Sequence, residues 1–480
     1  MIPNRFANAG AAPLDVRPPG ATSFPAGFRD IQKTDHTDSA NPLRTISFYV
    51  AVIFVFVKFG MIQEIQTVLM GFNGKLVYLL GIPSLFGVII GGGLVRTLSV
   101  RTGVYWTCYA LWLTIGTPFS TWRGGSLPAL LGYLKADIIM LFVVAGLVTN
   151  WKECTRVAAA IGLAGILNVI SGRIFAGDMG GRYGLAFGME SNPNDFAAHL
   201  LLVLPFVLYL VVSKRLFLVR IAAALAIPFG LYFALKTASR GALVAVCVDA
   251  VLFLALGNLR RRLAVICLVP VAAIALITFL PSDVLLRLRS FSSSDSGALI
   301  EAIDSSEARS YVLNKSIEYT FEFPLFGLGM DQFSEYEGSH NKLIGSHGYW
   351  HGTHNSFTEA SSEGGILAGV LLIAGWFSAF FVVLGVNRRA RKQPGCADIE
   401  QVTFYTLVGI GGFVVAITFL NFAYSFYGPA MGGLAVAIKR AAASEMANRA
   451  KRAAAGDGST VIPPAPLPSA RLAPAPAFRY

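Results

Sequence analysis

The sequence has 480 residues, of which 54% are hydrophobic and only 14% are charged, and its formal net charge is +12. Soluble globular domains carry about 25% charged residues, so this composition excludes an ordinary soluble protein. The apolar residues form continuous blocks, each long enough to cross a bilayer core of about 30 Å, and they do not alternate like the strands of a membrane barrel. We therefore expect an all-α, polytopic membrane bundle.

About twelve membrane spans are expected from the lengths of these blocks. Between residues 45 and 280 they are expected at 46–62, 76–95, 104–119, 127–148, 157–175, 196–212, 218–235, 241–256 and 263–280. Between residues 364 and 440 they are expected at 366–386, 402–424 and 429–438. Residues 281–363 form a long loop, and a helix over 312–321 is expected to end before Pro324. Residues 1–44 and 441–480, the latter rich in Ala and Pro, are expected to be disordered tails.

The basic residues indicate the orientation of the bundle. With the N-terminus inside, Lys and Arg should gather in every second loop. They do so at Arg96, Arg101, Lys152, Arg156, Lys214, Arg215, Arg260, Arg261, Arg262, Arg388, Arg389, Arg391, Lys392, Lys439 and Arg440. Both termini are therefore expected to be cytoplasmic, and the basic face can also meet anionic membrane lipids. A nucleic-acid partner is not expected, because these residues lie in separate loops.

Other sequence signals exclude several classes of protein. The five cysteines include no Cys-x-x-Cys pair, so neither a zinc site nor a disulfide framework is expected. The first apolar block begins too late for a cleavable signal peptide. The sequence also lacks an Asp-x-Asp motif and a phosphate-binding loop, so neither a metal-assisted nucleotide-sugar reaction nor ATP is expected to drive the chemistry. No cofactor is expected.

Polar motifs mark two of the outer segments. In residues 177–194, Arg182 precedes Asn192-Pro193-Asn194, a capping turn that opens a span. Arg182 either lies at the membrane interface for structural reasons or contacts an anion there. In the turn at 236–240, Arg240 opposes the positive-inside bias, and Ser239 is expected to cap the following helix. An arginine at a helix N-terminus is a favourable phosphate site.

The long loop carries two further candidates. Arg309 follows Glu307 and is either a member of a solvated ion pair or a substrate contact. His354-Asn355 lies just before an apolar block, where the histidine either caps a span or acts as a general base or an orienting donor. In the second case Asn355 could fix the ring, and Glu359 or Glu363 could raise its basicity.

Two alternative interpretations remain open. His347, His351 and His354 have a spacing that would face one metal ion in a helix, but the glycines among them oppose a helix. Asp137, His199 and Asp249 fall inside expected spans, where ionisable groups are costly and usually functional. They favour a proton-coupled transporter, unless Lys135 pairs with Asp137 and Asp195 with His199.

Taken in order, the outer motifs resemble those of the O-antigen ligase/polymerase superfamily of bacterial envelope enzymes. The matching elements are Arg182 with Asn192-Pro193-Asn194, then Ser239-Arg240-Gly241-Ala242, Arg309, Pro324-Leu325-Phe326-Gly327-Leu328-Gly329, and His354-Asn355 with Glu363 and Gly365. The resemblance extends over residues 175–390 and includes the span pattern and the long outer loop.

The resemblance implies a metal-independent glycosyltransferase of the bacterial inner membrane. It would move a glycan from an undecaprenyl diphosphate carrier to an acceptor hydroxyl at the periplasmic face, with inversion at the anomeric carbon. Arg240 and Arg182 would hold the diphosphate, and His354 would accept or orient the hydroxyl proton. The resemblance further implies substrate contacts from Arg309, Asn355, Asn194, Ser239 and Glu363. Tyr336, Tyr349 and Trp350 are candidates for stacking on a sugar.

The same resemblance implies the partners. The acceptor is a glycan, for a polymerase, or a lipid A core, for a ligase. These two activities share one donor, and the long acidic loop favours the polymerase. Membrane lipids and export or chain-length-control proteins are further expected partners. The alternative is a proton-coupled transporter or flippase of a lipid-linked glycan or small solute, and convergence of Arg182, Arg240 and His354 on one outer cavity would distinguish the enzyme from it.

Overall fold

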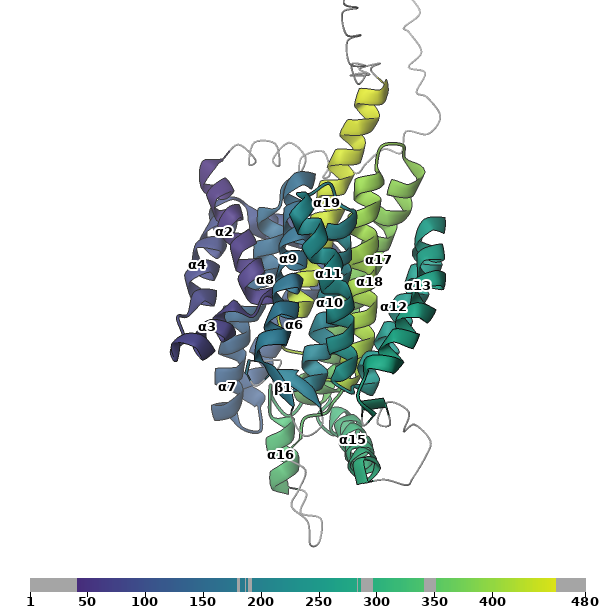
Figure 1. Ribbon diagram of the computed structural model, residues 1–480. Helices are drawn as coiled ribbons and strands as arrows, with labels where there is room; N and C mark the ends of the chain where they lie inside the picture. The colour runs from purple at the N-terminus through teal and green to yellow at the C-terminus, as the bar shows by residue number, and fades with distance from the viewer. Residues whose placement is uncertain are drawn as a thin grey trace, which may run out of the picture.

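The computed structural model describes residues 41–178, 182–185, 187–188, 192–282, 284–285, 297–340 and 351–454. Over these residues the chain is a helical bundle, as its composition predicts (Figure 1). The only strands in the described part are β1 (Ala176–Asp178) and β2 (Tyr183–Leu185), which pair antiparallel with Ala176 opposite Leu185. The lower end of the bundle carries β1, α15 and α16, and the C-terminal end of α19 projects from the upper end (Figure 1).

The helices follow the apolar blocks of the sequence. In the N-terminal half they are α2 (Pro42–Phe59), α3 (Ile62–Met70), α4 (Leu76–Ile90), α5 (Gly93–Leu98), α6 (Arg101–Gly116), η1 (Thr117–Phe119), α7 (Arg123–Gly132), η2 (Tyr133–Asp137), α8 (Ile139–Leu147), α9 (Trp151–Phe175) and α10 (Pro193–Val212). In the C-terminal half they are α11 (Phe217–Lys236), α12 (Arg240–Leu256), α13 (Leu259–Phe279), α15 (Gly297–Glu322), α16 (Phe333–His340), α17 (Ser356–Lys392), α18 (Ala397–Ala416), η3 (Ile417–Phe419) and α19 (Tyr427–Ala454).

Among the described residues, seven helices are long and apolar enough to cross a membrane. They are Pro42–Phe59, Arg123–Leu147, Trp151–Phe175, Pro193–Val212, Phe217–Lys236, Ser356–Lys392 and Ala397–Phe419. The expected number of about twelve spans is therefore not confirmed. One cause is visible in the block 76–95, where Gly92 adopts the left-handed conformation (φ 66°) and separates α4 from the short α5.

The first and last described helices extend into the expected tails. The helix α2 already starts at Pro42, where Asn41 caps it, so residues 42–44 do not belong to a tail. At the other end α19 continues to Ala454, whereas a short span and a tail from residue 441 were expected. The residues beyond 440 are rich in alanine, the best helix former, and Arg449 pairs with Glu445 at 2.8 Å. Residues 1–40 and 455–480 lie outside the described part.

Three arginine side chains cap the C-terminal end of α8. Their side chains donate to its last carbonyl groups: Arg44 to Leu147 (2.8 Å), Arg96 to Gly146 (2.7 Å) and Arg440 to Ala145 (3.4 Å). Arg44 also forms a buried ion pair with Glu153 at 2.9 Å. Cations at a helix C-terminus satisfy its exposed carbonyl groups and oppose its negative partial charge. Part of the basic charge expected from topology thus has a structural role.

The part of the long loop that follows α15 is hydrogen-bonded to the beginning of α17. The helix α15 ends at Glu322, before Pro324, as expected. The segment that follows runs against the beginning of α17: Leu328 N–H donates to the Ser362 carbonyl (2.9 Å), and Ile366 N–H donates to the Pro324 carbonyl (2.9 Å). At Gly365 the helix is interrupted (φ 79°, ψ 173°). The two glycine motifs of the family resemblance therefore contact each other.

Replacing Gly365 with alanine is expected to destabilise the protein strongly. Its backbone conformation is one that essentially only glycine adopts, at a cost of about 1–3 kcal/mol for other residues. A Cβ there would also overlap the Leu325 carbonyl group. The thermal unfolding midpoint in detergent should fall by several degrees. Gly132→Ala is the matched control, because nothing lies within 4 Å of a Cβ at that helical position. Equal midpoints for the two variants would contradict this expectation.

Candidate functional site

Arg182 connects two of the outer motifs. One of its terminal guanidinium nitrogens donates to the Asn194 side-chain oxygen at 2.6 Å, and its Nε donates to the Thr237 carbonyl at 3.0 Å. Asn192 accepts the Asn194 N–H at 2.9 Å and caps α10, as the Asn-Pro-Asn turn predicts. Arg182 therefore holds the start of α10 next to the turn that precedes α12.

That turn sets the position of Arg240. Ala238 adopts a left-handed conformation (φ 53°), and the chain then enters α12 with Arg240 as its first residue. The Ser239 hydroxyl accepts the Ala242 N–H at 3.3 Å, so the expected cap is confirmed. The helix N-terminus carries a partial positive charge, and the arginine adds a full one. Their combination attracts anions.

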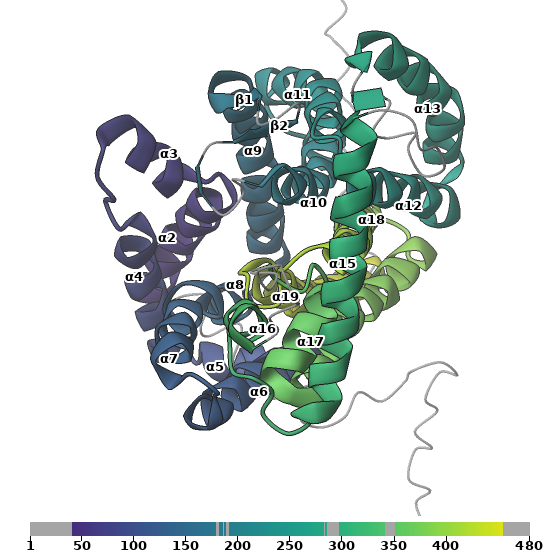
Figure 2. The ribbon, with the colours of Figure 1, turned by 90° about the horizontal axis from the view of Figure 1, so that it is seen from below.

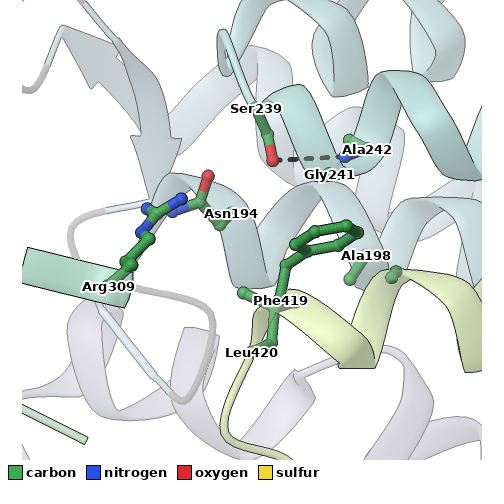
Figure 3. Close-up of a pocket in the computed structure, with 9 residues that line it drawn as sticks. Asn194, Ala198, Ser239, Gly241, Ala242, Arg309, Phe419 and Leu420 are labelled. Atoms are coloured by element: carbon green, nitrogen blue, oxygen red, sulfur yellow. Dashed lines mark hydrogen bonds between the residues drawn. The ribbon is translucent and has the colours of Figure 1, made fainter. Parts of the chain in front are cut away.

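A small pocket opens beside this turn. Residues from α10, α12, α15 and the end of α18 line it: Asn194, Ala198, Ser239, Gly241, Ala242, Arg309, Ala416, Phe419 and Leu420. Figure 3 shows the Arg309 guanidinium reaching toward Asn194, while Phe419 and Leu420 form the opposite, apolar side. Arg309 comes from α15, which lies across the lower end of the bundle (Figure 2). The pocket thus combines a cation, an amide and a helix N-terminus with an apolar wall.

His354 lies in the segment just before α17, next to the same wall. The residue is left-handed (φ 50°), and Asn355 caps α17 by accepting the Phe357 N–H at 2.9 Å and the Thr358 N–H at 3.2 Å. The Ser356 hydroxyl then donates to the carbonyl of Leu420, a pocket residue, at 2.7 Å. The cap and this hydrogen bond set where the His354 backbone sits.

The charge of Arg309 affects the pKa of His354. Burial, the positive charge of Arg309 and an electrostatic contribution from His351, in decreasing order, lower the pKa of His354 from 6.5 to about 4. The imidazole is therefore neutral at pH 7 and has a nitrogen available to accept a proton. The effect of Arg309 on this ring places the two side chains in one electrostatic environment.

Three of the eight expected site residues line one pocket, and others lie around it. The pocket is lined by Asn194, Ser239 and Arg309. Arg182 donates a hydrogen bond to Asn194, and His354 is close enough to Arg309 to feel its charge. Arg240 begins the helix whose Ser239 and Gly241 line the pocket, but Arg240 itself does not line it in the described part of the chain. The convergence expected of the enzyme was that of Arg182, Arg240 and His354 on one outer cavity, and none of these three residues lines the pocket in the described part of the chain.

Three side chains expected to contact substrate or His354 have other partners. The Glu363 carboxylate accepts the backbone N–H groups of Asp331 at 2.7 Å and Phe333 at 2.9 Å, so it braces the loop after Gly329. Glu359 accepts the Ala423 N–H at 3.0 Å. The Asn355 side chain accepts the N–H groups of the first turn of α17. In these positions the three side chains support the backbone around the pocket.

The alternative sites lie elsewhere or outside the described residues. Asp137 pairs with Lys58 from α2 at 3.1 Å, and the expected partner Lys135 is replaced by this contact. His199 lies between Asn168 (2.5 Å) and Tyr427 (2.7 Å), both from other helices. His347, Tyr349 and Trp350 are not described, and within the described part no group of three or more His, Cys, Asp or Glu side chains could hold a metal ion. Tyr336 packs edge-on against Tyr319, at 5.2 Å between ring centroids.

The non-helical segment between α18 and α19 was not predicted from the sequence. An unbroken span was expected over 402–424, yet helical structure ends at Phe419, and Phe419 and Leu420 line the pocket. Asn421 then accepts a hydrogen bond from Thr353 (3.1 Å), next to His354. The polar residue Asn421 within an apolar block was the available signal.

The described part of the chain is thus an apolar helical bundle with an anion-attracting pocket at one end. Residues 225–373 match a protein-family model described as O-antigen ligase. This match confirms the resemblance to the O-antigen ligase superfamily over these residues. The matched residues include Ser239, Arg240, Arg309 and His354, whereas Arg182 and Asn194 lie before them. No curated protein matched the chain.

Proposed function

We propose that this protein transfers a glycan from an undecaprenyl-diphosphate-linked donor to an acceptor hydroxyl at the periplasmic face of the bacterial inner membrane. The observation that carries the proposal is the pocket in which Arg309, Asn194 and the N-terminus of α12 converge, with a neutral His354 beside it. The family match supports the ligase or polymerase type of reaction.

The diphosphate would bind at the mouth of this pocket, against Arg309 and the start of α12, because the pocket itself, of about 10 Å³, holds about one water-sized group. Guanidinium groups form paired hydrogen bonds to phosphate oxygens, and a helix N-terminus contributes N–H donors and a positive partial charge. Arg240, the first residue of α12, adds a second cation. Arg182 would act mainly by position, because it holds the Ser239-Arg240 turn through Thr237 and Asn194. Negative charge grows on the diphosphate as the glycosidic bond breaks, and fixed cations lower the energy of that transition state.

The reaction balances without a further reactant. The acceptor oxygen forms a bond to the anomeric carbon, the bond from that carbon to the phosphate oxygen breaks, and the hydroxyl proton passes to His354. The diphosphate leaves on its lipid. In-line displacement inverts the anomeric carbon. The bound diphosphate would offset the charge of Arg309, so the pKa of His354 would rise from about 4 in the complex and make the ring a better base.

The orientation follows from the distribution of charge. The helix α15, which supplies Arg309 to the pocket, lies at the lower end of the bundle in Figure 1, whereas Arg389 lies near the C-terminal end of α17, at the upper end, and Arg96 and Arg440 bond to the C-terminal end of α8. By the positive-inside rule, the lower end would face the periplasm and both termini the cytoplasm. A cysteine introduced at His351, which is exposed, should react with a membrane-impermeant thiol reagent in cells with a permeabilised outer membrane. Reaction only after lysis would reverse the orientation.

Analysis of envelope glycans in a strain that lacks this protein tests the proposed function. Glycans with a single repeat would indicate a polymerase. Full-length chains retained on the lipid carrier would indicate a ligase, whose acceptor is the lipid A core. An unchanged glycan profile in a strain without a second copy would contradict the proposal. Partners for export or chain-length control would be identified by co-purification from the same strain background.

A further inference from the structure

A second cavity, of about 800 Å³, lies between α6, α17 and α19, away from the pocket described above. It is lined by three cations, Arg101, Arg389 and Lys439, and by the aromatic rings of Tyr105, Phe377 and Phe381. Arg101 begins α6, and Arg389 lies near the C-terminal end of α17, which is at the upper end of the bundle in Figure 1. Its volume falls in the range of small-molecule sites, about 300–1,000 Å³.

The helices around the cavity are held in fixed positions. Trp106 of α6 is buried between glycines of the two other helices, Gly375 of α17 and Gly432 of α19. Thr102 of α6 shares a hydroxyl–hydroxyl hydrogen bond of 2.6 Å with Ser378 of α17, which lines the cavity. Small side chains thus let the three helices approach closely beside the cavity.

The three cations of the cavity lack acidic partners among the described residues. The carboxylates at this end are paired with other cations: Glu153 with Arg44, Asp398 and Glu445 with Arg449, and Glu400 with Arg261 and Arg391. Arg101 is also placed in the first turn of α6, where the helix dipole disfavours a cation. A bound anion would satisfy all three charges and the helix N-terminus together.

The outer wall of the cavity is suited to hydrocarbon. Phe377 is 51% exposed and Phe381 60% exposed, and both project from the membrane-crossing helix α17. Aromatic rings in that position contact acyl chains, while the cations lie at the level of the headgroups. Basic pockets between membrane helices on the cytoplasmic side are known places for anionic lipid headgroups.

We propose that this cavity binds the phosphate headgroup of an anionic lipid, with the lipid chains lying against Phe377 and Phe381. The ligand class is a lipid phosphate, supplied either by an anionic phospholipid of the bilayer or by a polyprenyl phosphate. The proposal does not depend on the glycosyltransferase assignment, because the cavity and the candidate catalytic pocket share no residue.

Lipid titration of the purified full-length protein tests this site. Native mass spectrometry should show phosphatidylglycerol retained more tightly than phosphatidylcholine. Each of Arg101→Gln, Arg389→Gln and Lys439→Gln should weaken that retention about fivefold, and the triple variant about a hundredfold. Arg388→Gln is the matched control, since it removes the neighbouring charge of α17, which does not line the cavity. It should bind like the wild type.

Displacement by undecaprenyl phosphate identifies which lipid supplies the phosphate, and thermal midpoints show whether the variants fold. If undecaprenyl phosphate displaces phosphatidylglycerol from the wild type but not from the triple variant, the site takes the carrier lipid. If it fails to displace it, the site takes the bilayer phospholipid. Equal lipid binding by wild type and triple variant, an equal loss in Arg388→Gln, or equal displacement by inorganic phosphate would overturn the proposal. The thermal midpoint of each variant in phosphatidylcholine should match that of the wild type.

Discussion

Replacing His354 with alanine is expected to lower the rate of glycan transfer by about 10²–10⁴-fold, which is the usual contribution of a positioned general base. The protein should remain in the membrane in normal amount, because the cap of α17 comes from Asn355 and the link to Leu420 from Ser356. The measurement is the initial rate of transfer by purified protein from a lipid-diphosphate glycan to its acceptor.

His351→Ala is the control for that substitution. His351 is an exposed histidine three residues earlier, and its ring centroid lies 6.3 Å from that of His354. Its loss removes one of the smaller causes that lower the pKa of His354, so the rate should stay within about twofold of the wild type. A rate for His354→Ala equal to that of His351→Ala would exclude His354 as the base.

Replacing Arg309 with glutamine should have the second large effect. Removing a donor that stabilises developing negative charge typically costs about 10²–10³-fold in rate. Arg309→Lys, which keeps the charge but not the forked geometry, should recover part of the loss. Both variants are measured by kcat/KM for the lipid-linked donor.

The same substitution should move the pH profile in a defined direction. In the wild type, kcat/KM should fall on acidification only near pH 4, because this quantity reports the pKa of His354 in the free enzyme. The charge of Arg309 lowers that pKa, so Arg309→Gln should raise the acidic limb toward 6.5. The shift should be partial, since burial is the larger cause. If the acidic limb stays at the same pH in Arg309→Gln, the charge of Arg309 does not lower the pKa of His354.

The sequence predicts the local parts of this site well. The caps by Asn192 and Ser239 are formed within a few residues, so the motifs were sufficient to expect them. These features depend on hydrogen bonds between near neighbours in the chain, and composition alone established the helical class.

Contacts between segments that are far apart in the sequence could not be predicted in this way. Arg182 binds the Thr237 carbonyl, a backbone atom that no side-chain pattern reveals. Glu363 was expected to contact substrate, yet two backbone N–H groups of a loop about thirty residues away occupy it. Lys58 replaced Lys135 as the partner of Asp137 because two helices meet there. Such pairings follow from helix packing and not from spacing.

The central claim is that Arg309 and His354 act on one lipid-diphosphate donor. The most direct test is to follow purified protein in vesicles with a radiolabelled undecaprenyl-diphosphate glycan and its acceptor, and to count released undecaprenyl diphosphate against glycan transferred. We expect one carrier released for each glycan transferred by the wild type, and both products lost together in Arg309→Gln and His354→Ala. Transfer that persists in both variants, or carrier movement across the vesicle without bond cleavage, would contradict the account.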